Sequence, residues 1–207
     1  MTAEELHIKG REAGQRSSYE EAIAFFEKAH EADPEWPYPI YDLAFTYLLL
    51  QDWEKSLQYY IQCNEMAANG FYSAKTALWT LQKEQIGEYS KGLYLFYVQL
   101  EWMEETERMD KLRSILAKYP DYTPAIKSLQ SLIKDPESRL ELIERGLGME
   151  SDDETYGMLI VNKALLMTFY DKMAEAKQLL ENFLKSDRKT LMSNKIAESI
   201  FEQWTTI

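Results

Sequence analysis

The sequence predicts an all-α protein built as a stack of antiparallel helix hairpins. Residues 19–34 (YEEAIAFFEKAHEADP) and 53–68 (WEKSLQYYIQCNEMAA) align at an offset of 34, with small residues against small residues and aromatics against aromatics. Within the first stretch, Ala22, Phe26 and Ala29 have the i, i+4, i+7 spacing of one helix face. Strand-like alternation never lasts beyond a few residues. A fixed period near 34 is typical of stacked helix pairs, each of which buries its apolar face against a neighbour.

The first two helices have marked starts. Thr2 with Glu5, and Ser18 with Glu21, have the spacing of a capping box, in which a hydroxyl and a carboxylate satisfy free N–H groups of the first turn. We therefore expect helices to begin next to Thr2 and Ser18. The offset of 34 then predicts a second, equivalent hairpin.

Later boundaries are marked by glycine, by proline or by a capping pair: Gly87, Tyr119-Pro120, Thr123-Pro124, Asp135-Pro136, and Ser151 with Glu154. Together these signals predict about twelve helices and no sheet. We expect a last helix near residues 190–204 to cover the exposed end of the stack, because such arrays need a polar cap for solubility.

These residues resemble the tetratricopeptide repeat (TPR), which places a small residue and aromatics at set positions of two helices. The first unit carries Leu6, Gly10, Tyr19, Ala22, Phe26, Ala29 and Pro34, and the second carries Ile40, Leu43, Ala44, Tyr47, Trp53, Ser56, Tyr60 and Cys63. The resemblance implies a superhelical, TPR-like α-solenoid. We interpret residues 1–207 as a single TPR-like domain, with two well-matched repeats in 3–70, divergent repeats in 71–186 and a C-terminal capping helix in 190–204.

The divergent part keeps some of the pattern. Residues 161–184 resemble a further unit, with Ala164 at the Gly/Ala position of the first helix and Ala176 and Leu180 on the second. Between residues 71 and 118, however, the alternation of first and second helices loses its phase. Either one hairpin there is irregular or one helix boundary is misplaced.

The charge and composition exclude several functional classes. The formal net charge of −12 repels phosphate backbones and anionic lipid headgroups, so we expect no nucleic-acid partner and no membrane partner. The longest strongly apolar run, LYLFYV at 93–98, is far shorter than the roughly 20 residues of a membrane-spanning helix. No signal-peptide pattern is seen at the N-terminus, and Cys63 is the single cysteine. We expect an acidic, cytoplasmic protein.

Nothing in the sequence favours catalysis, a metal or a cofactor. The two histidines, His7 and His30, have no Cys, Asp or Glu neighbours in their own helices that would close a zinc site. Cys63 occupies the small-residue position equivalent to Ala29 and is interpreted as a buried thiol. The acidic run ESDDE at 150–154 lacks the spacing of a calcium loop, so a helix cap is the better interpretation. The chain is therefore predicted not to be an enzyme and to bind neither metal nor cofactor.

The resemblance implies that first helices line a concave, ligand-binding groove. Some members of the family clamp a C-terminal carboxylate, but this chain departs at those positions, with His7, Arg11, Asp42, Tyr72 and Thr76. An aromatic strip flanked by cations stands there instead, and such residue types dominate binding energy at protein interfaces. The predicted partner-binding groove comprises Arg11, Tyr38, Tyr41, Phe45, Tyr72, Lys75 and Trp79. The alternative is that these aromatics are packing residues, buried against adjacent helices or against the C-terminal helix with Trp204.

We therefore predict a protein–protein interaction adaptor or scaffold that binds a peptide or helix of a partner protein. A dedicated chaperone for one partner would use the same groove. The structural alternative is an oligomer-building subunit whose repeats serve self-assembly. Residues 92–103 (GLYLFYVQLEWM) form a helix that is apolar almost all round and must be covered. Burial within the chain is the default, and a homodimer through this helix is the weaker hypothesis.

Overall fold

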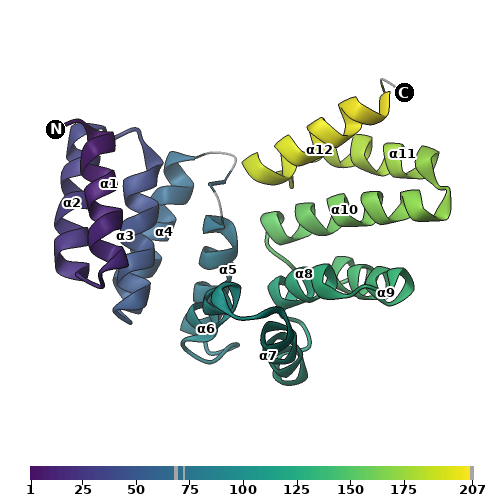
Figure 1. Cartoon of the computed structure of the whole chain (residues 1–207), viewed down its shortest axis with the longest axis horizontal. Coiled ribbons are helices and arrows are strands. Elements are labelled where there is room, and N and C mark those ends of the chain that lie inside the picture. The colour runs from purple at the N-terminus through teal and green to yellow at the C-terminus, as the bar shows by residue number, and fades with distance from the viewer. Residues whose placement is uncertain (68–69, 72, 206–207) are drawn as a thin grey trace. The chain divides into compact units, whose positions relative to one another are not determined.

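The computed structural model describes residues 1–67, 70–71 and 73–205 (Figure 1). Over these residues it contains helices and no strand, which confirms the all-α prediction. The α-helices are α1 (Ala3–Gln15), α2 (Tyr19–Ala32), α3 (Pro37–Leu49), α4 (Trp53–Met66), α5 (Ala74–Gln85), α6 (Leu93–Gln99), α7 (Glu105–Lys118), α8 (Thr123–Leu132), α9 (Pro136–Leu147), α10 (Asp153–Met167), α11 (Met173–Leu184) and α12 (Leu191–Thr205). Two 3-10 turns, η1 (Leu100–Trp102) and η2 (Thr168–Tyr170), extend α6 and α10.

The chain forms two compact units. Unit 1 runs from Met1 to Leu95 and unit 2 from Phe96 to Ile207. Each is described by itself below. That all 207 residues make one domain stays a prediction.

The first two hairpins of unit 1 repeat with the predicted offset (Figure 1). Helix α3 begins at residue 37 and α1 at residue 3, while α4 begins at residue 53 and α2 at residue 19, so both intervals are 34. The turns repeat as well. Ser17 and Gln51 adopt φ of 60° and 59°. The next residue in each turn donates its N–H to a carbonyl five residues back, Ser18 to Ala13 and Asp52 to Tyr47.

Close packing explains why small and aromatic residues alternate between the two helices of a hairpin. In the first hairpin, a Cβ added to Gly10 would clash with the ring of Phe26, which is itself buried. Ala22, Ala29 and Cys63 are fully buried at the equivalent small positions. A larger side chain at any of them would push the helices apart.

The third hairpin starts in register and then departs from it. The joint between successive hairpins repeats. The Trp36 N–H donates to Asp33 O, and 34 residues later the Gly70 N–H donates to Ala67 O. Yet α5 begins at Ala74, three residues later than the offset predicts, and ends in a turn at Gly87 with φ of 81°. Helix α6 has only 7 residues and continues as η1. Of the two explanations left open by the sequence, the structure supports an irregular hairpin.

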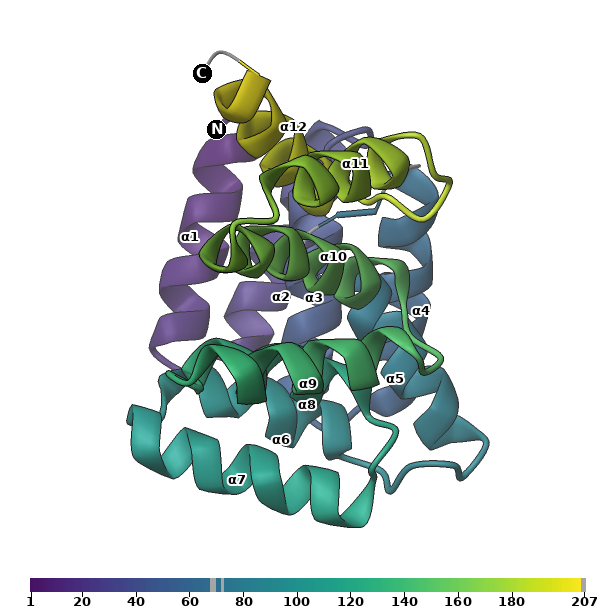
Figure 2. The same cartoon turned by 90° about the vertical axis from the view of Figure 1, so that its right-hand side faces the viewer.

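Unit 2 returns to the regular pattern. Tyr119 and Tyr122 form a joint between α7 and α8 with the bonds seen after α2, as Tyr119 N–H donates to Ile115 O and Tyr122 N–H to Tyr119 O. The α10–α11 turn places Asp171 at φ of 57°, with Lys172 N–H donating to Met167 O, as in the first two hairpins. Figure 2 shows α10 of this unit above α8 and α9, which lie one behind the other in this view, and α7 below them.

Residues 161–184, where a further repeat is predicted, contain a buried core. Ala164, Ala176 and Leu180 are fully buried, together with Phe183 and Val161. Helix α12 packs on this core through its partly buried apolar face, Ile196, Ile200, Phe201 and Trp204.

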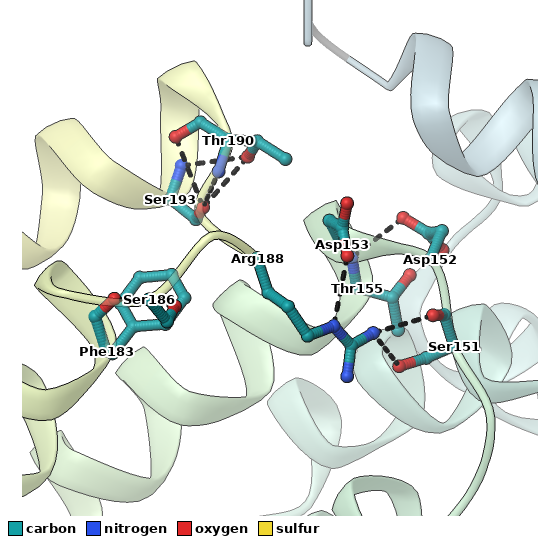
Figure 3. A network of polar contacts seen from close by, with 9 residues as sticks. All are labelled: Ser151, Asp152, Asp153, Thr155, Phe183, Ser186, Arg188, Thr190 and Ser193. Carbon is teal, nitrogen blue, oxygen red and sulfur yellow. Dashed lines mark hydrogen bonds and ion pairs between the residues drawn. The ribbon is translucent and has the colours of Figure 1, made fainter. Parts of the chain in front are cut away.

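Arg188 ties the start of α12 to α10 (Figure 3). Its guanidinium carbon lies 3.9 Å from the ring centroid of Tyr156, its Nε donates to Asp153 Oδ1 at 3.0 Å, and its Nη2 donates to Ser151 O at 2.8 Å. Thr190 donates to the buried carboxylate of Glu154. Burial raises the pKa of Glu154, although the Thr190 bond and Lys127 lower it in part.

Of the five predicted helix caps, two are present in the structure and three, at Ser18, Ser151 and Thr123, are not. Thr2 with Glu5 forms the complete capping box, and Asp135 caps α9 through Ser138 N–H. Ser18 makes no side-chain cap bond, and its backbone N–H, which a capping box would give to Glu21, donates to Ala13 O instead.

The caps of α10 and α8 are also misassigned by the sequence. Asp152, rather than Ser151, caps α10 through the N–H of Thr155, because its carboxylate favours the positive end of the helix. Thr123 instead donates to Glu150 O, and α8 starts without a side-chain cap.

Over the described residues, no helix is both long and apolar enough to cross a membrane.

Candidate functional site

The first helices of unit 1 carry the predicted aromatic side chains. Tyr38, Tyr41 and Phe45 stand on α3 at i, i+3 and i+7, so they share one face of the helix. All three are partly exposed, and Arg11 of α1 is exposed. Each of these four side chains is therefore at least partly accessible to solvent.

Ring contacts join these aromatics to residues outside the predicted set. Trp36, the N-cap residue of α3, lies 5.4 Å from Tyr38 between ring centroids. Phe71 meets Tyr38 edge-on at 4.7 Å and Tyr41 edge-on at 5.8 Å. We call Trp36, Tyr38, Tyr41 and Phe45, which are all partly exposed, the aromatic face. Phe71 is buried and supports this face from behind.

A histidine–aspartate pair fastens α1 to α3 beside the aromatic face. His7 Nε2 lies 2.8 Å from Asp42 Oδ2, and Arg11 Nε lies 4.0 Å from the same oxygen. The His7 ring is buried and meets the Trp36 ring edge-on at 4.9 Å. With its Nε2–H donated to Asp42, the imidazole holds the carboxylate in place and leaves the exposed Arg11 guanidinium only loosely engaged.

Helix α5, the first helix of the third hairpin, contributes less directly to the predicted groove than the sequence suggested. Lys75 and Trp79 of α5 are partly exposed; Trp79 meets Tyr89 edge-on at 5.8 Å, and Lys83 Nζ lies 5.1 Å from the Trp79 centroid. Thr76, which the resemblance places at a groove position, is buried, and α5 starts three residues later than the offset of 34 predicts. The predicted groove residue Tyr72 lies outside the described residues.

The interior beneath the aromatic face is inert. Tyr60 is fully buried and meets Tyr41 edge-on at 5.8 Å. Burial, with a smaller contribution from Asp42, raises the pKa of the Cys63 thiol to about 12, so the thiol stays protonated at neutral pH. This agrees with the interpretation of Cys63 as a packing residue. In the described part of the chain, no group of three His, Cys, Asp or Glu side chains is placed to hold a metal ion.

Sequence reasoning missed Trp36, the buried support Phe71 and the role of the His7–Asp42 pair. Trp36 stands just before the helix, whereas the groove positions were counted within helices only. His7 and Asp42 did stand at counted positions, but 35 residues separate them, and only the packing of α1 on α3 brings them together. The aromatic residue before Pro37 was the signal that could have revealed Trp36.

No protein-family model matches the chain. No curated protein matches it significantly either.

Similar solved structures include TTC0263, a thermophilic TPR protein of Thermus thermophilus, with 15% identity, a TM-score of 0.42 and 100% of both chains covered. MamA (41-end) of Desulfovibrio magneticus RS-1 has 13% identity and a TM-score of 0.41, covering 90% of this chain and 95% of that one. The P58(IPK) TPR domain has 13% identity and a TM-score of 0.40, covering 99% of this chain and 65% of that one. The chain thus resembles TPR proteins, as its sequence predicted. At these low scores, the description of the fold rests on the hairpins, turns and joints given above.

Proposed function

We propose that this protein is a protein–protein interaction scaffold and that the aromatic face of unit 1 binds a peptide segment of a partner protein. The observation that carries the proposal is the gathering of four partly exposed aromatic side chains on one helix and its N-cap. Exposed aromatics cost solvation free energy unless something covers them, and aromatic anchors are the commonest hot spots of protein interfaces.

The chemistry of the neighbours defines the peptide. Arg11 lies beside the aromatic face, near Asp42 of α3, and Lys75 of α5 is the second cation predicted there. The His7 bond already engages the Asp42 carboxylate. A peptide with an apolar or aromatic anchor and a nearby acidic residue would therefore match both the face and its cations. The residues proposed to contact it are Arg11, Tyr38, Tyr41, Phe45, Tyr72, Lys75 and Trp79, with Trp36 added from the structure.

Selection from a random peptide library against the intact protein tests this proposal. The selected peptides should share an aromatic or large aliphatic anchor and an acidic residue. Because truncation of a hot-spot residue typically costs about 2 kcal/mol, Tyr41→Ala should weaken their binding by about 30-fold.

Tyr59→Ala is the matched control, since Tyr59 is a partly exposed tyrosine on α4 of the same unit, where it stacks on Tyr47. Circular dichroism must show both variants folded. Equal losses with the two variants, or peptides without an anchor, would overturn the proposal. Arg11→Gln should weaken acidic peptides only, while Arg16→Gln should leave them unchanged, because Arg16 lies on the far end of α1 near Glu21.

One observation favours a second candidate, self-assembly. In the apolar stretch at residues 92–103, Leu93, Tyr94, Tyr97 and Leu100 are buried within the chain. Trp102 is 69% exposed and Phe96 is 36% exposed. Light scattering over a concentration series checks whether these two side chains mediate a homodimer, which Trp102→Ala should then dissociate. A monomer at high concentration would eliminate this candidate.

A location in the cytoplasm and the absence of catalysis stay predictions from the sequence.

A further inference from the structure

Unit 2 contains a hollow that neither the aromatic face nor the repeat pattern accounts for. It lies among α6, η1, α7 and α8. Its polar lining consists of Tyr97, Glu101, Arg108, Ser128 and Ser131, and its apolar floor of Leu100 and Leu112. This hollow is lined by one cation, one carboxylate and three hydroxyls. The hydrogen bonds and ion pairs that these groups already make indicate what the hollow can bind.

Arg108 is the donor of the hollow. Among the described residues its side chain has no ion-pair or hydrogen-bond partner, and its Nε is inaccessible to solvent and unsatisfied. A guanidinium has five N–H donors in a planar fork suited to a carboxylate. An unsatisfied buried donor on a charged group is destabilising, and an acceptor bound to the guanidinium would offset part of this cost.

The three hydroxyls have already donated their protons to the protein. Tyr97 Oη donates to Pro124 O at 3.0 Å, since a carbonyl can only accept. Ser128 Oγ, 2.8 Å from Tyr97 Oη, is then the donor in that pair, and Ser131 Oγ donates to Ser128 O at 2.7 Å. The serine oxygens therefore offer lone pairs, not protons, to anything in the hollow.

Glu101 adds a carboxylate to this set of acceptors. It is exposed and lines the same hollow as Arg108, but no ion pair joins the two among the described contacts, so their charged atoms are more than 4.0 Å apart. Opposite charges that share a hollow without neutralising each other leave room for a group that carries both signs.

The surroundings carry an excess of negative charge. Burial lowers the pKa of Lys127, the residue before Ser128 on α8, but Tyr97, Asp152, Glu154 and Glu101 together raise it above its ordinary value. One ammonium thus faces three carboxylates, so a second ammonium placed beside Glu101 would be favoured rather than repelled.

We propose that this hollow binds a free α-amino acid. The ligand carboxylate lies on the Arg108 guanidinium, and its ammonium donates to Glu101 and to the serine oxygens. A simple anion would meet the Glu101 carboxylate and the lone pairs of the serines. A simple cation would meet Arg108. Only a zwitterion satisfies both ends of the hollow.

The test is a titration of the full-length, ¹⁵N-labelled protein followed by NMR, with glycine as the probe. Glycine should shift the Arg108 Nε–H signal and the amides of Glu101, Ser128 and Ser131 in a saturable manner. N-acetylglycine, which lacks the ammonium, and glycinamide, which lacks the carboxylate, should each bind at least tenfold more weakly.

Variants locate the site. Arg108→Gln and Glu101→Gln should each weaken glycine binding at least tenfold, and both change side chains that the core does not need. Arg113→Gln is the matched control, because Arg113 is on the same helix, pairs with Asp110 at 3.6 Å and does not line the hollow. Circular dichroism checks that all three fold equally.

Three results would overturn the proposal. N-acetylglycine binding as tightly as glycine would make the hollow an anion site, and glycinamide binding as tightly would make it a cation site. No saturable shift with glycine up to about 100 mM would exclude a site of useful affinity. None of these outcomes bears on the aromatic face of unit 1, so the two proposals stand or fall separately.

Discussion

Gly10 and Phe26 interlock at the centre of the first hairpin. The ring occupies the place where any other residue at position 10 would put its Cβ, and Phe26 is buried. The distance between α1 and α2 therefore depends on the missing side chain.

Gly10→Ala should lower the free energy of unfolding by about 1–3 kcal/mol, because overpacking outweighs the better helix propensity of alanine. Urea denaturation followed by circular dichroism measures this change. Gly14→Ala is the control on the same helix. Its new Cβ would meet only the Cβ of Ala22, at 4.0 Å, so it should stabilise by about 0.5–1 kcal/mol. Equal effects of the two substitutions would contradict the clash.

At the scale of single residues, the sequence predicts which positions are small or aromatic better than it predicts which side chains of different helices are in contact. The matching of Gly10 with Phe26 follows from the small and aromatic positions of the repeat. The contact of His7 with Asp42 does not, since it depends on how far α1 and α3 rotate about their axes, and a rotation of one residue position would separate the two side chains.

Helix α6 is too short to hold its own first turn and depends on a side chain from α5. Glu84 is buried, and its carboxylate accepts N–H bonds from Gly92 at 2.8 Å and from Tyr94 at 2.7 Å. With 7 residues, α6 lacks the length at which an isolated helix is stable, so this distant cap replaces a local one.

Glu84→Ala should leave those N–H groups unsatisfied and cost about 1–3 kcal/mol. Hydrogen exchange of the α6 amides should speed up more than that of α3. The control is Glu88→Ala, which removes an exposed carboxylate paired with Lys83 at 2.6 Å; pairs of this kind contribute about 0–1 kcal/mol. Unchanged exchange in α6 would show that the helix does not need the cap.

The same residue gives stability a pH dependence. Burial raises the pKa of Glu84, although the N–H groups of Tyr94, Gly92 and Leu93 lower it in part. The folded protein therefore binds the proton more tightly than the unfolded chain, whose glutamate titrates near 4.5. The contribution of Glu84 is fully present below that pH and is lost as pH rises through the raised pKa.

Glu84→Gln removes this titration. The difference in unfolding free energy between the variant and the original protein should move in favour of the variant as pH rises from about 4.5 to about 7. Urea denaturation at both pH values measures the difference. A shift in the opposite direction would mean that the N–H bonds outweigh the burial.

Helix boundaries were predictable where the capping side chain and the backbone conformation favour the same start or end of the helix. The Thr2 capping box, the Asp135 cap and the glycine turn after α5 follow from local chemistry. The Ser18 box was wrong because the N–H of Ser18 donates to Ala13 O in the turn, and Ser151 was wrong because its neighbour Asp152 caps the helix. The late start of α5 has no local signal that we can identify.

At the scale of the whole molecule, charge opposes compactness. The net charge of −12 produces self-repulsion that folding increases, because it brings the carboxylates closer together. Salt screens this repulsion without touching the buried cores of either unit.

Raising the ionic strength from about 10 mM to about 1 M shortens the Debye length from about 30 Å to about 3 Å, so the thermal midpoint should rise by a few degrees. Calorimetry in sodium chloride measures this rise. Choline chloride should give the same curve, since screening depends on ionic strength and not on the cation. A flat or falling midpoint would show that attractive pairs outweigh the repulsion.

The overall class was predictable because a 34-residue period repeats both helices and turns. The phase between residues 71 and 118 was not, because α6 and η1 together fill the place of a full-length second helix. The candidate site was predictable in residue type, as aromatics with cations, but the place of Trp36 and the burial of Thr76 emerge only from packing.

The turn that closes α1, α3 and α10 has Ser17, Gln51 and Asp171 at its left-handed position, and the turn after α5 has Gly87 there. Its bonds run between main-chain atoms alone, so four different side chains serve one geometry. Substitutions of these side chains can therefore leave the geometry of the turn unchanged. Repeats of this kind can diverge in evolution until their residues no longer identify them, while the shape they share is inherited unchanged.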